Sequence, residues 1–391
     1  MVSVAKHNTP ALRFHGFDGE WETSELNVLV EVGNGRDYKH LNEGRIPVYG
    51  TGGYMLSVDQ ALSYNKDAIG IGRKGTIDKP YLLRAPFWTV DTLFFVMAKS
   101  GIDLPFLFSV FQRVDWKSKN TATGVPSLTN QAIEQTTVTI APSLKEQRAI
   151  GELFTDLDAL IEQHRAKHAN LQQTKTALMQ RMFPQDGADE PELRLNGFSA
   201  AWDEVQIKNV SDVLVGNPFQ SSSFVDDGIR LVRGTNVKRG WLDFDSSMTV
   251  FWPSIRGVET FLLDENDILL QMDGALIGKS FAMVAKTDLP ALLVQRVARV
   301  RAHHNVDPKF LYQWFVKDFF GYIRSVKTET AVPHLSALDI LSFRIKIPPT
   351  LEEQRAIGEV FSNLDALIAA EHLYITQLTQ AKTALLQRMF V

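Results

Sequence analysis

Apolar side chains recur at steps of three and four residues in two long stretches, one in the middle of the chain and one at its C-terminal end. That spacing is typical of a helix that buries one face against a partner helix. The positions expected to pair the two helices are Leu153, Leu157, Leu160, Leu171, Leu178, Val360, Leu364, Leu367, Leu378 and Leu385. Ser143 and Thr350 stand at the expected N-caps, and the glutamates Glu146 and Glu353 follow at the spacing of a capping box. A helix of about 40 residues is roughly 60 Å long, so the pattern predicts two rods.

The two helical stretches are copies of each other. Residues 146–183 and 353–390 align without a gap at an offset of 207, and 23 of the 38 positions are identical. A second match, Leu12–Trp21 with Leu193–Trp202, has an offset of 181, so the units that follow these landmarks differ in length. An internal repeat of this size defines the architecture.

The repeat predicts four segments. They are a variable unit at 1–142, a helical arm at 143–184, a second variable unit at 185–349 and a second arm at 350–391. Two copies in one chain can pair about a pseudo-two-fold axis only if the helices run antiparallel.

The arms differ most in their centres. His164, Arg165 and Lys167 in the first arm stand against Glu371 and Tyr374 in the second. This difference either favours pairing of the arms within one chain over pairing between two chains, or it marks ordinary solvated helix faces.

Both variable units alternate apolar and polar residues between glycine- and aspartate-rich turns, which is the pattern of strands. The strand-like runs lie within 46–55, 67–77, 88–98, 229–244, 267–284 and 294–302. The chain is therefore predicted to be a mixed α+β protein, with two strand-rich domains separated by two long antiparallel helices.

Composition narrows the class of protein. A chain of 391 residues with 45% apolar residues fits a globular protein of two or three domains. No run approaches the roughly 20 apolar residues of a membrane span, and the N-terminus lacks the apolar stretch of a secretory signal. We therefore expect a cytoplasmic protein with no membrane contact. Without cysteine, and without histidines at ligand spacing, we expect no metal site.

No segment carries the residues of a catalytic site. Residues 274–280 resemble a phosphate-binding loop, but three residues separate their glycines where that loop needs four. Asn217-Pro218-Phe219 is one proline short of a methyltransferase signature. Asp156 and Asp158 point about 200° apart on a helix, so they cannot share one metal ion. The chain is predicted to be non-catalytic.

The arms read EQRAIGE…LDALI…KTAL…QRMF, and the units contain GTGG…IGRKG and DGALIGKS. Together these motifs resemble the DNA specificity subunit of type I restriction–modification systems, and the resemblance covers the whole chain. It implies two target-recognition domains that bind double-stranded DNA. It also implies docking to two methyltransferase subunits and, in the full enzyme, to two ATP-driven restriction subunits. S-adenosylmethionine, ATP and Mg²⁺ then belong to those partners, and no cofactor belongs to this chain.

Basic and polar residues in turns are the expected DNA contacts, because lysine and arginine meet phosphates and arginine and asparagine read base edges. In the first unit they are Thr51, Gly52, Arg73, Lys74, Lys117, Lys119, Thr121, Thr123 and Ser127. In the second unit they are Arg233, Thr235, Asn236, Lys238, Arg239, Lys279, Arg324, Lys327, Thr328 and His334. Solvated basic turns and a simple glycine hairpin remain the alternatives.

The net charge of −4 is unusual for a protein that binds DNA alone. Either the basic residues gather on one face, or partner subunits supply much of the phosphate contact.

The predicted function is positional. Each unit reads one short DNA word, and the arms fix the distance between words about 10 base pairs apart. Because the units differ, the target should be bipartite and asymmetric. The alternative is a coiled-coil assembly scaffold whose globular units bind proteins.

Overall fold

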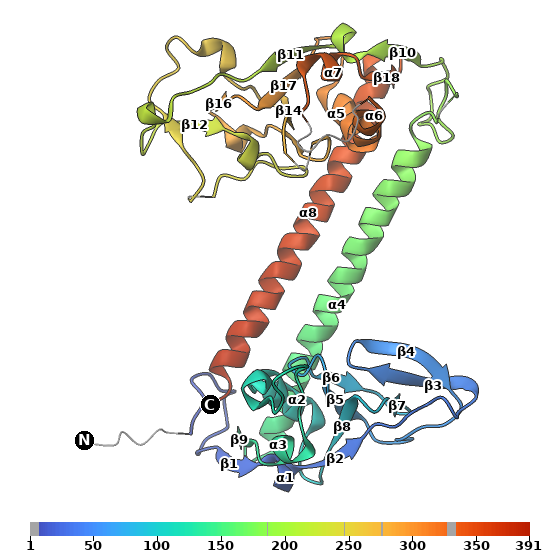
Figure 1. The fold of residues 1–391 in the computed structure, drawn as a ribbon, viewed down its shortest axis with the longest axis vertical. Coiled ribbons are helices and arrows are strands. Elements are labelled where there is room, and N and C mark those ends of the chain that lie inside the picture. The colour runs from blue at the N-terminus through green and yellow to red at the C-terminus, as the bar shows by residue number, and fades with distance from the viewer. Residues whose placement is uncertain (1–7, 186, 246, 275–276, 327–333) are drawn as a thin grey trace. The chain divides into compact units, whose positions relative to one another are not determined.

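The structure, a computed structural model, describes residues 8–185, 187–245, 247–274, 277–326 and 334–391 (Figure 1). It divides into two compact units. Unit 1 consists of Met1–Lys167 with Glu371–Val391, and unit 2 is His168–Ala370. Each unit therefore combines one strand-rich segment with part of both long helices. The predicted mixed architecture of two strand-rich domains and two long helices is confirmed, whereas the four segment boundaries remain a prediction.

Three sheets make up the strand-rich part of unit 1. Its strands are β1 (Glu22–Glu25), β2 (Val30–Asn34), β3 (Glu43–Gly50), β4 (Gly53–Val58), β5 (Ala68–Gly72), β6 (Tyr81–Leu83), β7 (Trp88–Thr89), β8 (Leu93–Ala98) and β9 (Thr137–Ile140). The sheet orders are β2-β8-β5-β6, β4-β3-β7 and β1-β9. The pair β3–β7 is parallel and the other pairs are antiparallel.

The helices of unit 1 are α1 (Leu26–Leu29), α2 (Leu104–Arg113) and α3 (Asn130–Glu134). Helix α2 begins where the Asp103 carboxylate accepts the Phe106 N–H at 2.9 Å, an N-cap that satisfies one free donor of the first turn. Trp21, Phe106 and the C-terminal Phe390 meet in the core of this unit, with ring centroids 5.5–5.7 Å apart. The C-terminal helix is thus anchored in the N-terminal domain.

Unit 2 repeats this topology strand for strand. Its strands are β10 (Asp203–Gln206), β11 (Ser211–Val215), β12 (Ile229–Val232), β13 (Phe251–Trp252), β14 (Ile268–Gln271), β15 (Phe281–Met283), β16 (Ala291–Leu293), β17 (Val297–Ala302) and β18 (Arg344–Ile347). Its helices are α5 (Pro308–Lys317), α6 (Phe319–Val326) and α7 (Ala337–Leu341). The sheet orders are β11-β17-β14-β15, β13-β12-β16 and β10-β18, again with one parallel pair, β12–β16.

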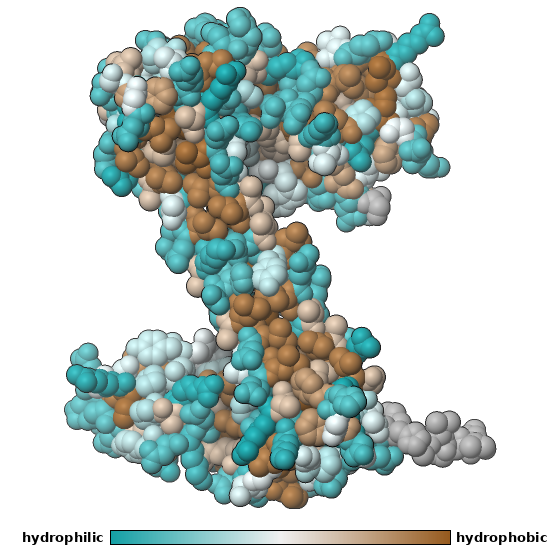
Figure 2. Space-filling view, turned by 180° about the vertical axis from the view of Figure 1, so that it is seen from behind, coloured by the Kyte–Doolittle hydropathy of each residue, from teal (hydrophilic) through white to brown (hydrophobic). Residues whose placement is uncertain are grey.

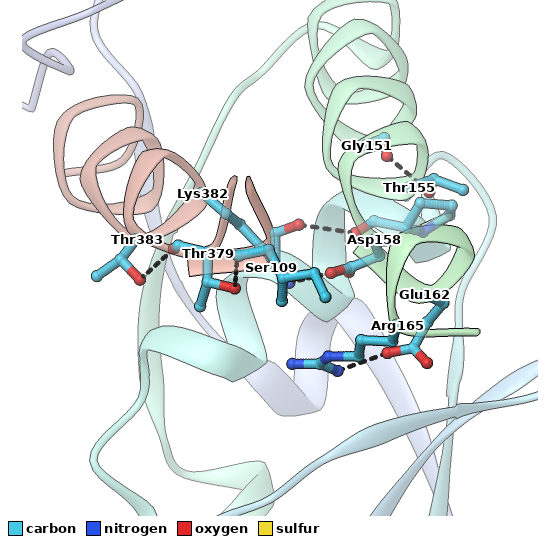
Figure 3. A network of polar contacts seen from close by, with 11 residues as sticks. Ser109, Gly151, Thr155, Asp158, Glu162, Arg165, Thr379, Lys382 and Thr383 are labelled. Atoms are coloured by element: carbon cyan, nitrogen blue, oxygen red, sulfur yellow. Dashed lines mark hydrogen bonds and ion pairs between the residues drawn. The ribbon is translucent and has the colours of Figure 1, made fainter. Parts of the chain in front are cut away.

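The long helices are α4 (Leu144–Arg181) and α8 (Leu351–Arg388). Within unit 1, Asp158 of α4 binds Lys382 of α8 at 2.6 Å (Figure 3). Six residues further along α4, His164 binds Glu371, which lies earlier in α8. Within unit 2, Lys175 binds Asp365 at 2.6 Å. In unit 1 the two helices therefore run antiparallel.

A strict heptad of covered positions lines the facing sides of the two helices. The covered residues are Ile150, Phe154, Leu157, Ile161, His164, His168, Leu171, Lys175, Leu178, Met182, Ile357, Phe361, Leu364, Ile368, Glu371, Ile375, Leu378, Lys382, Leu385 and Met389. This register contains six of the ten predicted pairing residues.

The other four predicted pairing residues, Leu153, Leu160, Val360 and Leu367, are corrected. Each precedes a seam residue by one position, and one helical step of about 100° turns it off the seam. Leu367 is 50% exposed. Leu153 and Val360 instead pack against the cores of their own units. Leucine spacing alone does not identify the seam, because isoleucine and phenylalanine occupy it beside each of these four residues.

The predicted helix starts are close to those observed, but the glutamates do a different job. The Thr350 hydroxyl accepts the Glu353 N–H at 3.3 Å, which is the expected cap. Both glutamate side chains are buried, and arginines bind them. Arg13 binds Glu146 at 2.6 Å, and Arg194 binds Glu353 at 2.8 Å. The capping-box spacing therefore marks a buried ion pair that ties each N-terminal segment to its helix.

The centres of the arms pair within unit 1. The Glu371 side chain is only 10% exposed and lies 2.7 Å from His164 Nδ1. Lys167 binds the other carboxylate oxygen, and Tyr374 packs its ring 4.5 Å from that of His164. Of the two interpretations of the central sequence, solvated helix faces are ruled out for Glu371.

Candidate nucleic-acid interface

Two predicted DNA-binding segments of unit 1 meet at one corner of the domain. Strand β5 is fully buried, and the chain emerges from it at the exposed turn Arg73-Lys74. Lys74 pairs with Ser127 in an antiparallel bridge. The Leu128 N–H donates to the Arg73 carbonyl at 2.9 Å, and the Gly75 N–H donates to the Pro126 carbonyl at 2.8 Å. Residues about 50 positions apart thus form one surface, which we call corner 1 (Thr51–Gly52, Arg73–Gly75 and Lys117–Ser127).

The glycine-rich turn between β3 and β4 adjoins corner 1. A β-carbon placed on Gly75, which has a φ of +89°, would lie 4.0 Å from the Thr51 hydroxyl. The Tyr81 hydroxyl anchors the turn by donating to the Gly50 carbonyl at 2.6 Å. Burial raises the pKa of Tyr81, so the phenol remains a donor. Sequence reasoning missed this anchoring residue.

Charge is unevenly distributed on corner 1. Lys117 pairs with Asp78 at 2.9 Å, and this hydrogen bond raises the Lys117 pKa. Arg73, Lys74 and Lys119 are exposed and form no ion pair among the described residues. Thr121 bonds to the Ser127 carbonyl at 3.0 Å through its N–H, and Thr123 is exposed. The corner therefore presents unneutralised cations beside small polar groups, which suits a phosphate backbone.

Unit 2 builds the same corner with different residues. Asp273 bridges to His334, as Lys74 bridges to Ser127, and the Leu335 N–H donates to the Met272 carbonyl at 2.7 Å. Arg296 pairs with Asp273 at 3.1 Å and has a φ of +73°. We call Gly234–Thr235, Met272–Gly274, Arg296 and His334 corner 2.

Sequence reasoning found His334 but missed Asp273 and Arg296. Arg296 lies in the turn before β17, where unit 1 has Thr92 before β8, and each carbonyl accepts the matching N–H after β14 or β5. Arg296 is found only when the strands of unit 2 are matched to those of unit 1, because no single sequence offset aligns the two units.

One predicted base-reading residue of unit 2, Asn236, is corrected, whereas the role of its neighbour Arg233 remains a prediction. Asn236 is fully buried, and its side chain accepts the Arg233 N–H at 3.0 Å and donates to the Asp243 carbonyl at 2.8 Å. Arg233 is half-buried and donates to the Met248 carbonyl. The Asn236 amide holds the turn together, because buried polar atoms find partners inside the protein, and it does not face a base. The buried Nε of Arg233 has no partner among the described residues.

The other predicted residues of unit 2 that the structure describes lie at the surface. Thr235 and Arg239 are exposed, and Lys238 pairs with Asp243 at 3.5 Å. Lys279 and Arg324, which are distant in the sequence, both lie against the ring of Phe320. Lys279 Nζ lies 4.1 Å and Arg324 Cζ 6.0 Å from the centroid of Phe320, which orders both cations at little cost. Lys327 and Thr328 lie outside the described residues.

Neither a metal-binding cluster nor a membrane-spanning helix occurs among the described residues. In this part of the chain, no group of three or more histidine or acidic side chains could hold a metal ion. None of its helices is long and apolar enough to span a membrane. Figure 2 shows hydrophobic side chains at the surface of the long helices among hydrophilic ones, and Leu367 and Leu373 are at least half exposed.

Comparison with known proteins agrees with this organisation. The sequence model of the family described as "Type I restriction modification DNA specificity domain" matches residues 18–173 and 201–380. The type I restriction enzyme MjaVIII specificity subunit of Methanocaldococcus jannaschii is 24% identical over 273 residues, covering 68% of this chain and 64% of the relative. The EcoAI specificity subunit of Escherichia coli is 31% identical over 170 residues, covering 43% of this chain and 28% of the relative. The matches thus span less than two thirds of these relatives' own lengths.

A solved structure has the same fold. The crystal structure of the type I restriction–modification S subunit from M. genitalium superposes with a TM-score of 0.77, covering 98% of this chain and 99% of that one, at 14% identity.

Proposed function

Because the chain belongs to the family of type I restriction modification DNA specificity domains, we propose that it is the DNA-recognition subunit of a type I restriction–modification complex. Segments 1–142 and 185–349 are its two target-recognition domains. Each reads one half of a bipartite, asymmetric DNA target, and the subunit has no catalytic site of its own.

One observation carries this proposal. The two units share every strand pairing, yet the same bridge joins Lys74 to Ser127 in one and Asp273 to His334 in the other. Two domains that recognise different DNA sequences need the same backbone framework with different side chains at the contact surface, which is what the two units have. A symmetric scaffold has no physical reason to change charge there.

The proposed partners follow from the family and from the charge. Double-stranded DNA is the ligand, and two methyltransferase subunits dock on this chain, joined by ATP-dependent restriction subunits in the full enzyme. S-adenosylmethionine, ATP and Mg²⁺ bind to those subunits. A net charge of −4 suits a subunit that binds DNA firmly only when its partners add phosphate contacts. Such a complex acts in the cytoplasm.

The arms at 143–184 and 350–391 act as a ruler in this proposal. Lengthening both by the same number of helical turns should widen the spacer between the two DNA words and leave both words unchanged. If the spacer length does not change in that variant, the arms do not set the distance between the two DNA words.

The test is to co-express the chain with a cognate methyltransferase and to sequence adenine methylation across the host genome. Replacing 185–349 with the corresponding unit of another family member should change one word and keep the other. A stable complex without any methylated motif would favour the rival function, a protein-binding coiled-coil scaffold.

A further inference from the structure

The turn 237–242 of unit 2 presents a large aromatic residue to solvent. Trp241 is 60% exposed. Tryptophan is highly buried on average in folded proteins, so an exposed fraction of 60% sets this residue apart.

The turn is held in one conformation. Val237 is buried and bridges to Leu242, and the Lys238 N–H donates to the Trp241 carbonyl at 3.0 Å. The Gly240 N–H donates to the carbonyl of Phe281 in β15 at 2.8 Å. Beneath the turn, the buried Asn236 fixes its base. Trp241 is therefore presented by a rigid support, so little conformational entropy is lost when it is covered.

The surroundings of the turn are basic. Lys238 and Arg239 belong to it, and Arg239 bridges to Phe281, two residues beyond Lys279. Lys279 and Arg324 flank the Phe320 ring from the neighbouring loop and helix. Of these four cations, Lys238 pairs with Asp243 at 3.5 Å, which leaves Arg239, Lys279 and Arg324 to meet the phosphates of duplex DNA while the Trp241 ring meets sugars and bases.

Unit 1 also carries an exposed aromatic residue after the glycine turn of its corner. Strands β3 and β12 each pair parallel with a short strand and then enter a glycine turn. In unit 1, Tyr54 follows at once in strand β4 and is 63% exposed, whereas in unit 2 Trp241 lies seven residues beyond Gly234, in the separate turn 237–242. Both units thus carry an exposed ring in the chain that follows the glycine turn of the corner.

We propose that Trp241 contacts a base step of the second DNA word as an apolar wedge, and that Tyr54 has this role for the first word. The inference rests on the proposed DNA-recognition function and assigns it two residues. The cations attract any duplex. The ring adds affinity only at a base step that unstacks easily enough to admit it, so the wedge contributes to sequence specificity.

The test uses the full chain in complex with its methyltransferase and a duplex that carries the methylated motif. Trp241→Ala should weaken binding about tenfold, in line with the loss of one stacking contact, and should lower methylation of that motif. Trp241→Phe should keep most of both. Ile255→Ala, at an exposed apolar residue of the same unit, is the matched control and should leave both unchanged. Thermal unfolding of all variants should match wild type, since both sites are exposed.

A 2-aminopurine probe placed at each position of the second word, except at the methylated adenine, gives an independent readout. Wild type should raise its fluorescence at one step, and Trp241→Ala should abolish that rise. If Trp241→Ala binds the duplex as tightly as wild type does, the proposed role of Trp241 is wrong, while the proposed function stands. The same follows if the variant loses the methyltransferase subunit, which would make Trp241 a protein contact. A wild-type complex that binds no specific duplex would instead refute the proposed function.

Discussion

The ends of the two arms make contacts through residues that both copies of the repeat share, whereas the centre makes contacts through residues that differ between the copies. At the ends, the same contacts occur twice. Phe183 stacks on Phe310 in unit 2 as Phe390 stacks on Phe106 in unit 1, with centroids 5.7 Å and 5.5 Å apart. At the centre, His164 faces Glu371, and these two residues occupy the same position of the repeat, since 371 − 164 = 207.

This difference concerns the choice of partner. The end contacts use residues that both arms share, so they cannot distinguish α4 from α8. Two copies of α4 paired in the same register would place His164 against a second His164 beside two lysines, and two copies of α8 would bring two Glu371 carboxylates together. Like charges in a covered layer are costly. The centre therefore favours the pairing of unlike arms.

The largest effect is expected at the shared ends. Glu146→Ala leaves Arg13 in a side-chain environment that is only 11% exposed, without its carboxylate. It also removes the acceptor of Trp21 Nε1, 3.3 Å away. We expect a loss of about 3–5 kcal/mol in the free energy of unfolding, the cost of breaking one partner of a buried pair.

Glu353→Ala is the matched variant of unit 2. The buried Trp202 Nε1 has no hydrogen-bond partner among the described residues, so Glu353→Ala leaves one group fewer without its partner than Glu146→Ala does. Its loss should be smaller by about 1 kcal/mol, the worth of one hydrogen bond. Urea denaturation of both variants decides the matter, and equal losses would contradict the role given to Trp21.

A smaller effect is expected from the glycines at the start of each arm. A β-carbon on Gly151 would lie 2.4 Å from Asp103 Oδ1, and one on Gly358 would lie 2.6 Å from Asp307 Oδ1. Alanine favours a helix by about 1 kcal/mol over glycine, but overpacking costs about 1–3 kcal/mol. We expect Gly151→Ala and Gly358→Ala to destabilise the chain equally. A raised melting temperature for either would show that α2 or α5 moves aside freely.

The centre should be sensitive to acid. Hydrogen bonds from His164 and then from Lys167 lower the Glu371 pKa below its ordinary value of 4.5. A carboxylate with a lowered pKa in the folded state stabilises it above pH 4.5, and this contribution disappears as the pH falls through the lowered pKa. Glu371→Gln should therefore flatten the pH dependence of the melting temperature below pH 4.5. A slope identical to wild type would exclude this role.

The smallest effect belongs to the ion pairs between ends and centre. Asp158–Lys382, seen in Figure 3, and Asp365–Lys175 are repeat-related, and their carboxylates are 39% and 40% exposed. Lys382→Met and Lys175→Met should each change the free energy of unfolding by no more than about 1 kcal/mol, the range of solvent-exposed pairs. Unequal values in denaturant titrations would show that the two units differ here as well.

The features that the sequence predicts correctly depend on residues close together in the chain. Helices α4 and α8 begin directly after the predicted N-caps Ser143 and Thr350, because capping and a step of 3.6 residues act within a few neighbours. The offset of 207 fixed the order of units and arms. The basic turn Arg73-Lys74 after a buried strand was also visible, since apolar runs and turn residues are short-range signals.

Tertiary structure decided what depends on distant residues. The sequence places Glu146 at a capping position, but only folding brings Arg13, 133 residues away, to its carboxylate. Asn236 has the chemistry to read adenine, yet burial turns its amide to the backbone around it. Corner 2 gains Asp273 and Arg296 because strand pairing, rather than spacing along the chain, sets which turns meet. Side-chain chemistry is inherited from the sequence, whereas its partner and its exposure belong to the fold.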